Sequence, residues 1–113
     1  MVTKAPSEMR LLQGNEACAL AALAAGCRFY AGYPITPSSE IAEHMAHRLP
    51  QTGGVFVQME DEIASICACI GASLGGARSF TASSSNGLAY MTENVFAAGY
   101  CRLPIVLIAV NRT

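Results

Sequence analysis

The chain has 113 residues, a formal net charge of −1, 52% hydrophobic residues and only 13% charged residues. This length fits a single domain over residues 1–113, and so few charges provide little polar surface to cover a lone domain. We therefore expect an oligomer, and the scattered charges exclude the basic stripe that nucleic acid binding requires.

Membrane insertion and export are not predicted. The longest uncharged apolar run covers residues 17–27, which is too short to cross a bilayer, and the first ten residues lack the apolar core of a secretory signal. We therefore expect a cytoplasmic protein with no membrane partner. Five cysteines without a C-x-x-C spacing predict reduced thiols that serve as small core residues rather than zinc or iron–sulfur ligands.

Apolar periodicity alternates between helical and strand patterns along the chain. Helices are expected over residues 14–25, 36–49, 60–75 and 88–100. Strands are expected over residues 27–33, 55–59, 77–81 and 103–110. This alternation predicts an α/β fold with three layers, α/β/α, and a mainly parallel sheet covered on both faces. Because the chain ends directly after a strand, we expect the domain to be incomplete at its C-terminal end.

Two helix starts are the best defined. Thr36 and Pro37 suit the N-cap and the first position of the second helix, with Glu40 in its first turn. The third helix begins at residues 60–62. Its expected apolar face is Ile63, Ile66, Cys67, Ile70 and Leu74, and its other positions are small residues that allow close approach to a sheet: Ala64, Ala68, Gly71, Ala72 and Gly75.

Ligands of open parallel sheets bind beyond the carboxyl ends of the strands. Four segments should meet there: residues 33–39, 60–62, 82–87 and 111–113. The serine-rich segment 82–87 could bind an anion through free N–H groups or simply begin a helix, and the residues leave both open. His44 and His47, with Glu40 and Glu43, lack a further convergent ligand and favour a solvated helix face over a metal site.

Several segments together resemble one known family. Residues 32–40, GYPITPSSE, resemble the Y-P-I-T-P-S-S signature of the 2-oxoacid:ferredoxin oxidoreductases. Residues 59–64, MEDEIA, resemble the segment that carries the family's cofactor-activating glutamate, and residues 102–112 resemble its next strand. The match runs from about residue 12 to the end of the chain, in order and at compatible spacing.

The resemblance implies the N-terminal, pyrimidine-binding domain of an α-type subunit, with the thiamin diphosphate-binding fold. Glu62 matches the glutamate that hydrogen-bonds the ring nitrogen N1′ of thiamine diphosphate and promotes its activation. Thr36 matches the threonine that contacts the substrate carboxylate, and Arg112 matches the arginine that pairs with it. Further cofactor contacts are expected from Pro34, Ile35, Ser84, Ser85 and Asn86.

The family implies oxidative decarboxylation of a 2-oxoacid to an acyl-coenzyme A with reduction of ferredoxin. The G-D-G…N motif that holds the diphosphate and Mg²⁺ is absent from this sequence. The resemblance therefore implies a β-type partner subunit for the diphosphate, with Mg²⁺ and [4Fe–4S] clusters on partner subunits or regions outside this sequence.

Two questions stay open at this level. Residues 83–87, SSSNG, match neither the T-S-G-P-G form nor the S-Q-G-L form of this family's loop, so the 2-oxoacid could be pyruvate, 2-oxoglutarate or a related acid. The alternatives are a non-catalytic assembly module and a thiamine-dependent decarboxylase without ferredoxin chemistry, which the Y-P-I-T-P-S-S signature disfavours.

Overall fold

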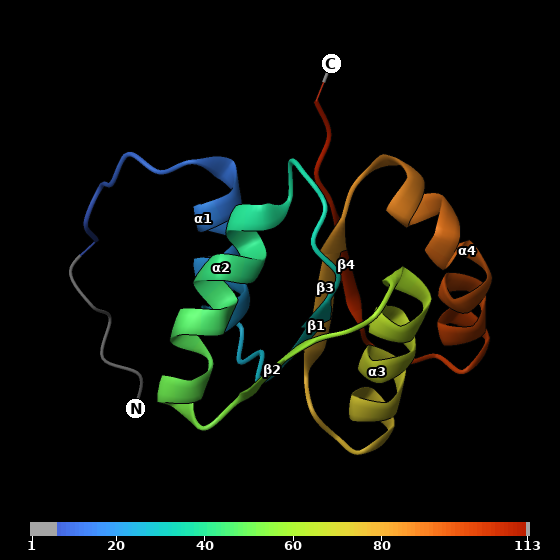
Figure 1. The fold of residues 1–113 in the computed structure, drawn as a ribbon. Coiled ribbons are helices and arrows are strands. Elements are labelled where there is room, and N and C mark those ends of the chain that lie inside the picture. The colour runs from blue at the N-terminus through green and yellow to red at the C-terminus, as the bar shows by residue number, and fades with distance from the viewer. Residues whose placement is uncertain (1–6, 113) are drawn as a thin grey trace.

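The computed structural model describes residues 7–112, and within them helices and strands alternate (Figure 1). The elements are α1 Gly14–Ala24, β1 Phe29–Gly32, α2 Ser39–Arg48, the short 3-10 helix η1 Pro50–Thr52, β2 Val55–Gln58, α3 Glu62–Leu74, β3 Ser79–Ser83, α4 Ser85–Tyr100 and β4 Val106–Ala109. Their order is the one that the apolar periodicity predicts.

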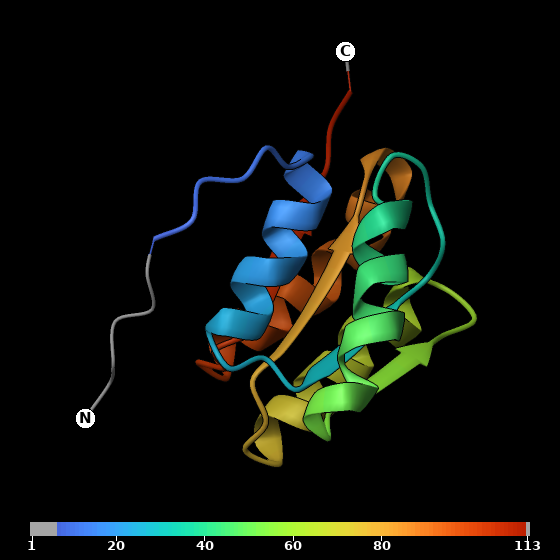
Figure 2. The same ribbon diagram turned by 90° about the vertical axis from the view of Figure 1, so that its left-hand side faces the viewer.

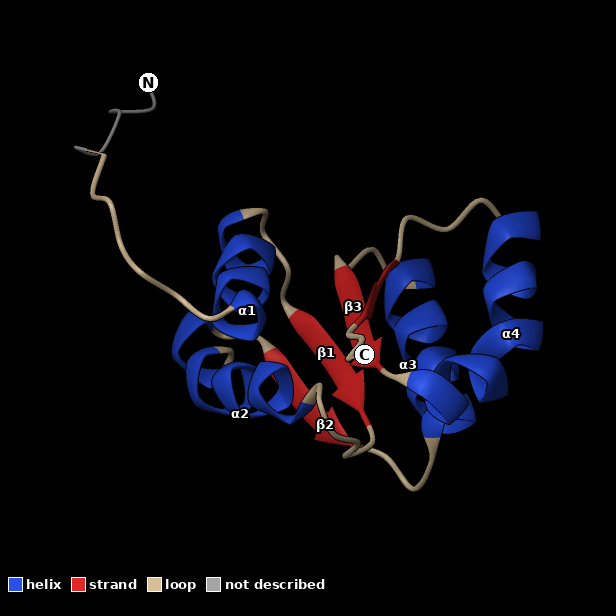
Figure 3. Ribbon diagram, turned by 90° about the horizontal axis from the view of Figure 1, so that it is seen from above, coloured by secondary structure: helices blue, strands red, loops and turns tan. Residues whose placement is uncertain are grey.

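The strands form one sheet in the order β2-β1-β3-β4, and all three pairings are parallel. Seen from above, α1 and α2 cover one face of the sheet and α3 and α4 the other (Figure 3). The predicted three-layer α/β/α fold with a parallel sheet is therefore confirmed. Because all strands run the same way, their carboxyl ends meet at one edge, the upper edge in Figure 1.

The main core lies between the sheet and the pair α1–α2, which stand side by side in Figure 2. Tyr30 on β1 stacks on Phe56 of β2 at 5.5 Å between ring centroids and meets Phe80 of β3 edge-on at 4.8 Å. Helix α2 adds the buried side chains Ile41, Met45 and Leu49, which recur at the four-residue spacing of one helix face. This core fixes the central strands and hence the edge at which they end.

Helix α3 packs by a different side from the one predicted. Its buried residues are Ser65, Ile66 and Cys69, whereas Cys67 is exposed and Leu74 is 69% exposed. The reason is close approach, because Ser79 Oγ on β3 donates to Cys69 O at 2.8 Å, a contact that bulky side chains would prevent. Small residues do lie at this contact, but they are Ser65 and Cys69, whereas the predicted Gly71 and Gly75 are exposed. The assignment of Cys67 and Leu74 to the buried face is also wrong.

The cysteines divide into two groups. Cys27 and Cys69 are buried, as predicted for small core residues, and burial raises the pKa of the Cys27 thiol and raises that of Cys69 to about 12. Cys67 and Cys101 are exposed, so the same prediction is wrong for them. All five thiols are free.

Two strands begin later than predicted, because the turns that close the preceding helices take up the first residues assigned to these strands. Ala77 N donates to Ala72 O, and Gly76 has a φ of +94°, so residues 76–77 close α3 and β3 begins at Ser79 instead. In the same way Leu103 N donates to Ala98 O and closes α4, which moves the start of β4 to Val106.

Candidate functional site

The carboxyl ends of the strands are linked directly to one another. Met59 N, just after β2, donates to Gly32 O at the end of β1 over 2.9 Å. Val110 N, just after β4, donates to Ser83 O at the end of β3 over 3.0 Å. The segments predicted to meet at this edge of the sheet therefore do emerge side by side.

Helix α3 presents Glu62 at this edge through a well-formed N-terminus. Asp61 is the N-cap, and its Oδ1 accepts a hydrogen bond from Ala64 N at 2.7 Å. Ser65 Oγ donates back to Asp61 O at 2.8 Å. The capped turn fixes the backbone position of Glu62, which is the first residue of the helix and is half-buried.

Loss of the Asp61 cap should destabilise the N-terminus of α3, where Glu62 lies. We expect Asp61→Ala to lower the free energy of unfolding by about 1 kcal/mol, because the Ala64 N–H loses its acceptor. Asp61→Asn should keep most of that stability, since asparagine caps almost equally well. Denaturant titration of the intact protein measures both, and equal stability of the alanine and asparagine variants would contradict the assignment of Asp61 as the cap.

Glu62 and the end of β3 pack closely against Gly87 of α4. A Cβ on Gly87 would lie 2.1 Å from Ser83 Oγ and 3.0 Å from Glu62 Oε1, so only a glycine lets both side chains lie there. Ser83 Oγ is fully buried and has no hydrogen-bond partner among the described residues. The Glu62 side chain likewise makes no hydrogen bond or ion pair within the part of the chain that the structure describes. A carboxyl and a hydroxyl without such partners therefore lie against the same glycine.

The serine-rich segment is ordered into the fold more fully than predicted. Ala82 and Ser83 belong to β3, and α4 already begins at Ser85, so the expected loop shrinks to Ser84. The reason is that β3 pairs with β4 up to its last residue, Ser83 with Ala109. Ser84 is buried at the N-cap position, whereas Ser85 and Asn86 are exposed in the first turn of α4.

The segment between β1 and α2 is a fixed turn, and here the predicted helix start is wrong. Ser38 N and Ser38 Oγ both bond to Ile35 O, at 3.0 and 2.8 Å, so residues 35–38 form a turn and α2 begins at Ser39. Thr36 is therefore not the N-cap. Its side chain is exposed, Ile35 is half-buried and Pro34 is exposed, and the Thr36–Pro37 peptide is cis.

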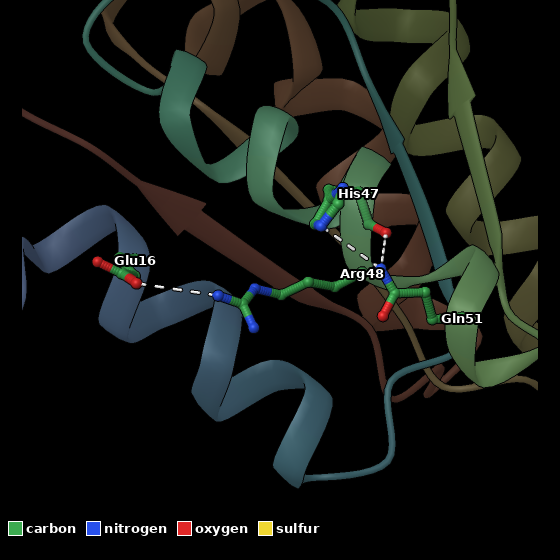
Figure 4. Close-up of polar contacts among 4 residues, drawn as sticks. All are labelled: Glu16, His47, Arg48 and Gln51. Carbon is green, nitrogen blue, oxygen red and sulfur yellow. Dashed lines mark hydrogen bonds and ion pairs between the residues drawn. The ribbon is translucent and has the colours of Figure 1, made fainter.

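Helix α1 braces that turn. Asn15 Nδ2 donates to Pro37 O at 2.7 Å and to Glu40 Oε2 at 2.9 Å. The first turn of α1 also meets the last turn of α2, where Arg48 Nη2 lies 3.9 Å from Glu16 Oε1 (Figure 4). Asn15 thus links α1 to both the turn that carries Thr36 and the start of α2.

Arg112 follows β4 and is exposed at the same edge of the sheet. Within residues 7–112 no hydrogen bond or ion pair joins it to Thr36 or Glu62. The structure therefore brings Glu62 together with the end of β3 and the start of α4. It places Thr36 after β1 and Arg112 after β4, with β3 between these two strands.

The histidines of α2 lie apart from this edge. His47 contacts Gln51, whose Nε2 lies 3.4 Å from His47 Nε2 and donates to His47 O at 3.0 Å (Figure 4). Glu40 is engaged by Asn15. Across the described residues no three metal-ligating side chains form a group.

A cavity of about 570 Å³ lies on the α1 face of the sheet, near the amino ends of β3 and β4. Apolar side chains dominate its lining, among them Ala22, Phe80 and Ile108. It contains none of the candidate site residues, so it is a feature of packing rather than the site described above.

Two residues of the site were not among those predicted from the sequence, Ser83 and Gly87. Both fall inside the serine-rich segment that the sequence analysis singled out. The signal that could have identified them is the glycine near the start of a helix. Glycine is unfavourable inside helices, so its presence there indicates that another group approaches the backbone closely.

Fold and geometry together define a parallel α/β domain with a candidate site, centred on a carboxylate, at the carboxyl edge of its sheet. Residues 20–113 match the family described as pyruvate flavodoxin/ferredoxin oxidoreductase, thiamine diP-bdg, and the chain belongs to this family.

Relatives of known activity support this assignment. The 2-oxoglutarate synthase subunit KorA of Methanocaldococcus jannaschii is 53% identical over 93% of this chain and 29% of its own length. The pyruvate synthase subunit PorA of the same organism is 40% identical over 93% of this chain and 28% of its own length. The chain thus spans under a third of these relatives.

A solved structure has the same fold. A 2-oxoglutarate:ferredoxin oxidoreductase from Magnetococcus marinus, with 2-oxoglutarate, coenzyme A and succinyl-CoA bound, matches with a TM-score of 0.87 and 44% identity. The match covers 89% of this chain and 18% of that one. In the part of the chain that the structure describes, no helix has the length and apolar character needed to span a membrane.

Proposed function

We propose that this chain supplies the aminopyrimidine half of a thiamine diphosphate site in a 2-oxoacid:ferredoxin oxidoreductase. The observation that carries the proposal is the Glu62 carboxyl, which begins α3 at the carboxyl edge of the sheet beside Ser83 and Gly87. A ring with hydrogen-bonding nitrogens suits this site, because neither the Glu62 carboxyl nor the Ser83 hydroxyl has a partner among the described residues and Gly87 lets both lie against its Cα.

When bound, thiamine diphosphate supplies a nucleophilic carbon and accepts the electron pair that remains when the 2-oxoacid loses CO₂. Glu62 would hydrogen-bond the ring nitrogen N1′ and hold or release a proton there. Pro34 and Ile35 would pack against the ring from the β1–α2 turn. Ser84, Ser85 and Asn86 would contact the cofactor from the start of α4.

Thr36 and Arg112 are proposed to bind the carboxylate of the 2-oxoacid. The exposure of both side chains at the edge of the sheet leaves them accessible to a substrate. A guanidinium suits this task because it can donate two parallel hydrogen bonds to one carboxylate. The brace from Asn15 would keep the Thr36 segment in place while substrate enters.

The remaining functions of the enzyme would lie outside these 113 residues. The diphosphate and Mg²⁺ would be held by a β-type subunit, and [4Fe–4S] clusters would pass electrons to ferredoxin while coenzyme A takes the acyl group. The outer side of α4 supports contact with another polypeptide, since Phe96 is 67% and Tyr100 88% exposed. A cytoplasmic location stays a prediction from the sequence.

We propose 2-oxoglutarate as the 2-oxoacid, because within one organism the 2-oxoglutarate synthase subunit is 53% identical to this chain and the pyruvate synthase subunit 40%. With the intact complex, coenzyme A and a viologen acceptor, kcat/KM for 2-oxoglutarate should exceed that for pyruvate by about 100-fold or more. A preference for pyruvate or 2-oxoisovalerate would overturn the substrate, and no reduction with any 2-oxoacid would overturn the function.

A further inference from the structure

One face of β3 carries three hydroxyls, and only the first is satisfied. Phe80 and Ala82 point into the core under α1 and α2, so the alternate residues Ser79, Thr81 and Ser83 face α3. Ser79 Oγ donates to Cys69 O at 2.8 Å. Thr81 and Ser83 are fully buried, and neither hydroxyl has a hydrogen-bond partner among the described residues.

Of these two unpaired hydroxyls, Ser83 is the one beside the candidate site. It is the last residue of β3, and its Oγ lies against Gly87, as Glu62 Oε1 does. Thr81 lies two residues earlier on the strand, about 6–7 Å further from that edge. Burying a hydroxyl without a partner costs stability, so a buried donor kept at this edge beside a carboxylate indicates that the two pair in the working site.

We propose that Ser83 is a positioning residue whose hydroxyl donates a hydrogen bond to the Glu62 carboxylate and holds it toward N1′ of the cofactor, an inference that rests on the proposed function. An ionised carboxylate only accepts hydrogen bonds, and a serine hydroxyl is a donor that rotates freely. No hydrogen bond joins the two side chains in this structure. Both oxygens lie against Gly87, where a Cβ would be 2.1 Å from Ser83 Oγ and 3.0 Å from Glu62 Oε1, so rotation about their side-chain bonds would bring the donor to the carboxylate.

The decisive measurement is the affinity of the intact, cofactor-stripped enzyme for thiamine diphosphate in a double-mutant cycle. Ser83→Ala should weaken binding about tenfold, the size expected for one charge-assisted hydrogen bond. In a Glu62→Ala background the same change should have no further effect, because the carboxylate that Ser83 serves is gone. Additive losses would show that Ser83 acts without Glu62 and would overturn the proposal.

Two further variants separate the hydroxyl from its packing. Thr81→Val removes an equally buried, equally unpaired hydroxyl and should leave the affinity unchanged. Ser83→Cys fills the same space with a weaker donor and should lose affinity as Ser83→Ala does. If Ser83→Cys bound thiamine diphosphate like the native enzyme, packing would explain the alanine result and the positioning role would be refuted.

Thermal unfolding shows whether each variant is folded. If Ser83→Ala does not fold, the affinity of Ser83→Cys relative to the native enzyme tests the proposal. Failure of the proposed function would look different. Native enzyme that binds no thiamine diphosphate overturns both proposals. Native enzyme that binds it, loses affinity with Glu62→Ala and keeps it with Ser83→Ala and Ser83→Cys overturns only the role of Ser83.

Discussion

Replacing Glu62 by Gln should lower turnover of the complete oxidoreductase by about 10²–10⁴-fold, the range that one general acid–base group contributes. Glutamine has the same size and still hydrogen-bonds, but it cannot hold and release a proton at N1′. The complex should assemble normally, because the Glu62 side chain makes no hydrogen bond or ion pair to the described residues that the substitution would break. Viologen reduction and size-exclusion chromatography measure the two effects.

Glu60 provides the matched control. It lies two residues before Glu62, is exposed, and precedes the capped turn of α3. Glu60→Gln removes the same charge from the same segment and should leave turnover within a factor of about two, as expected for an exposed surface position. Normal turnover of Glu62→Gln would remove Glu62 from the chemistry and favour an assembly module without catalysis.

Local signals were enough to predict the order of the elements. Gly26 and Gly76 adopt positive φ values and end α1 and α3, and Asp61 caps α3 as an acid at a helix start should. Since parallel strands end at one edge, the sequence also indicated which segments meet there. Glu62 was reached by the family resemblance, because an acid in a first helical turn is common for dipole reasons alone.

The features that the sequence did not predict depend on contacts between residues that are far apart in the chain. The polar run 83–87 suggests a loop when considered alone, yet Ser83 is buried in β3 because β4 pairs with it and the small-residue side of α3 approaches it. The burial of Cys69 instead of Cys67 has the same origin. The order β2-β1-β3-β4 likewise depends on long-range pairing, which local periodicity does not encode.

Gly87→Ala is expected to damage the site through a single methyl group. The new Cβ would lie 2.1 Å from Ser83 Oγ and 3.0 Å from Glu62 Oε1, so at least one of these side chains must move. Overpacking of this kind costs about 1–3 kcal/mol, which exceeds the gain of up to about 1 kcal/mol from replacing a helical glycine. We therefore expect lower stability and a thiamine diphosphate affinity reduced by about tenfold or more.

Gly71 on α3 separates this crowding from the general effect of glycine in a helix. A Cβ there would meet nothing within 4 Å, so Gly71→Ala should raise the free energy of unfolding by about 0.5–1 kcal/mol and leave cofactor affinity unchanged. Calorimetric titration with thiamine diphosphate and denaturant unfolding of both variants make the comparison. If Gly87→Ala behaved like Gly71→Ala, the close approach of Ser83 and Glu62 to Gly87 would not be needed for the cofactor, because a methyl group could be added there without loss.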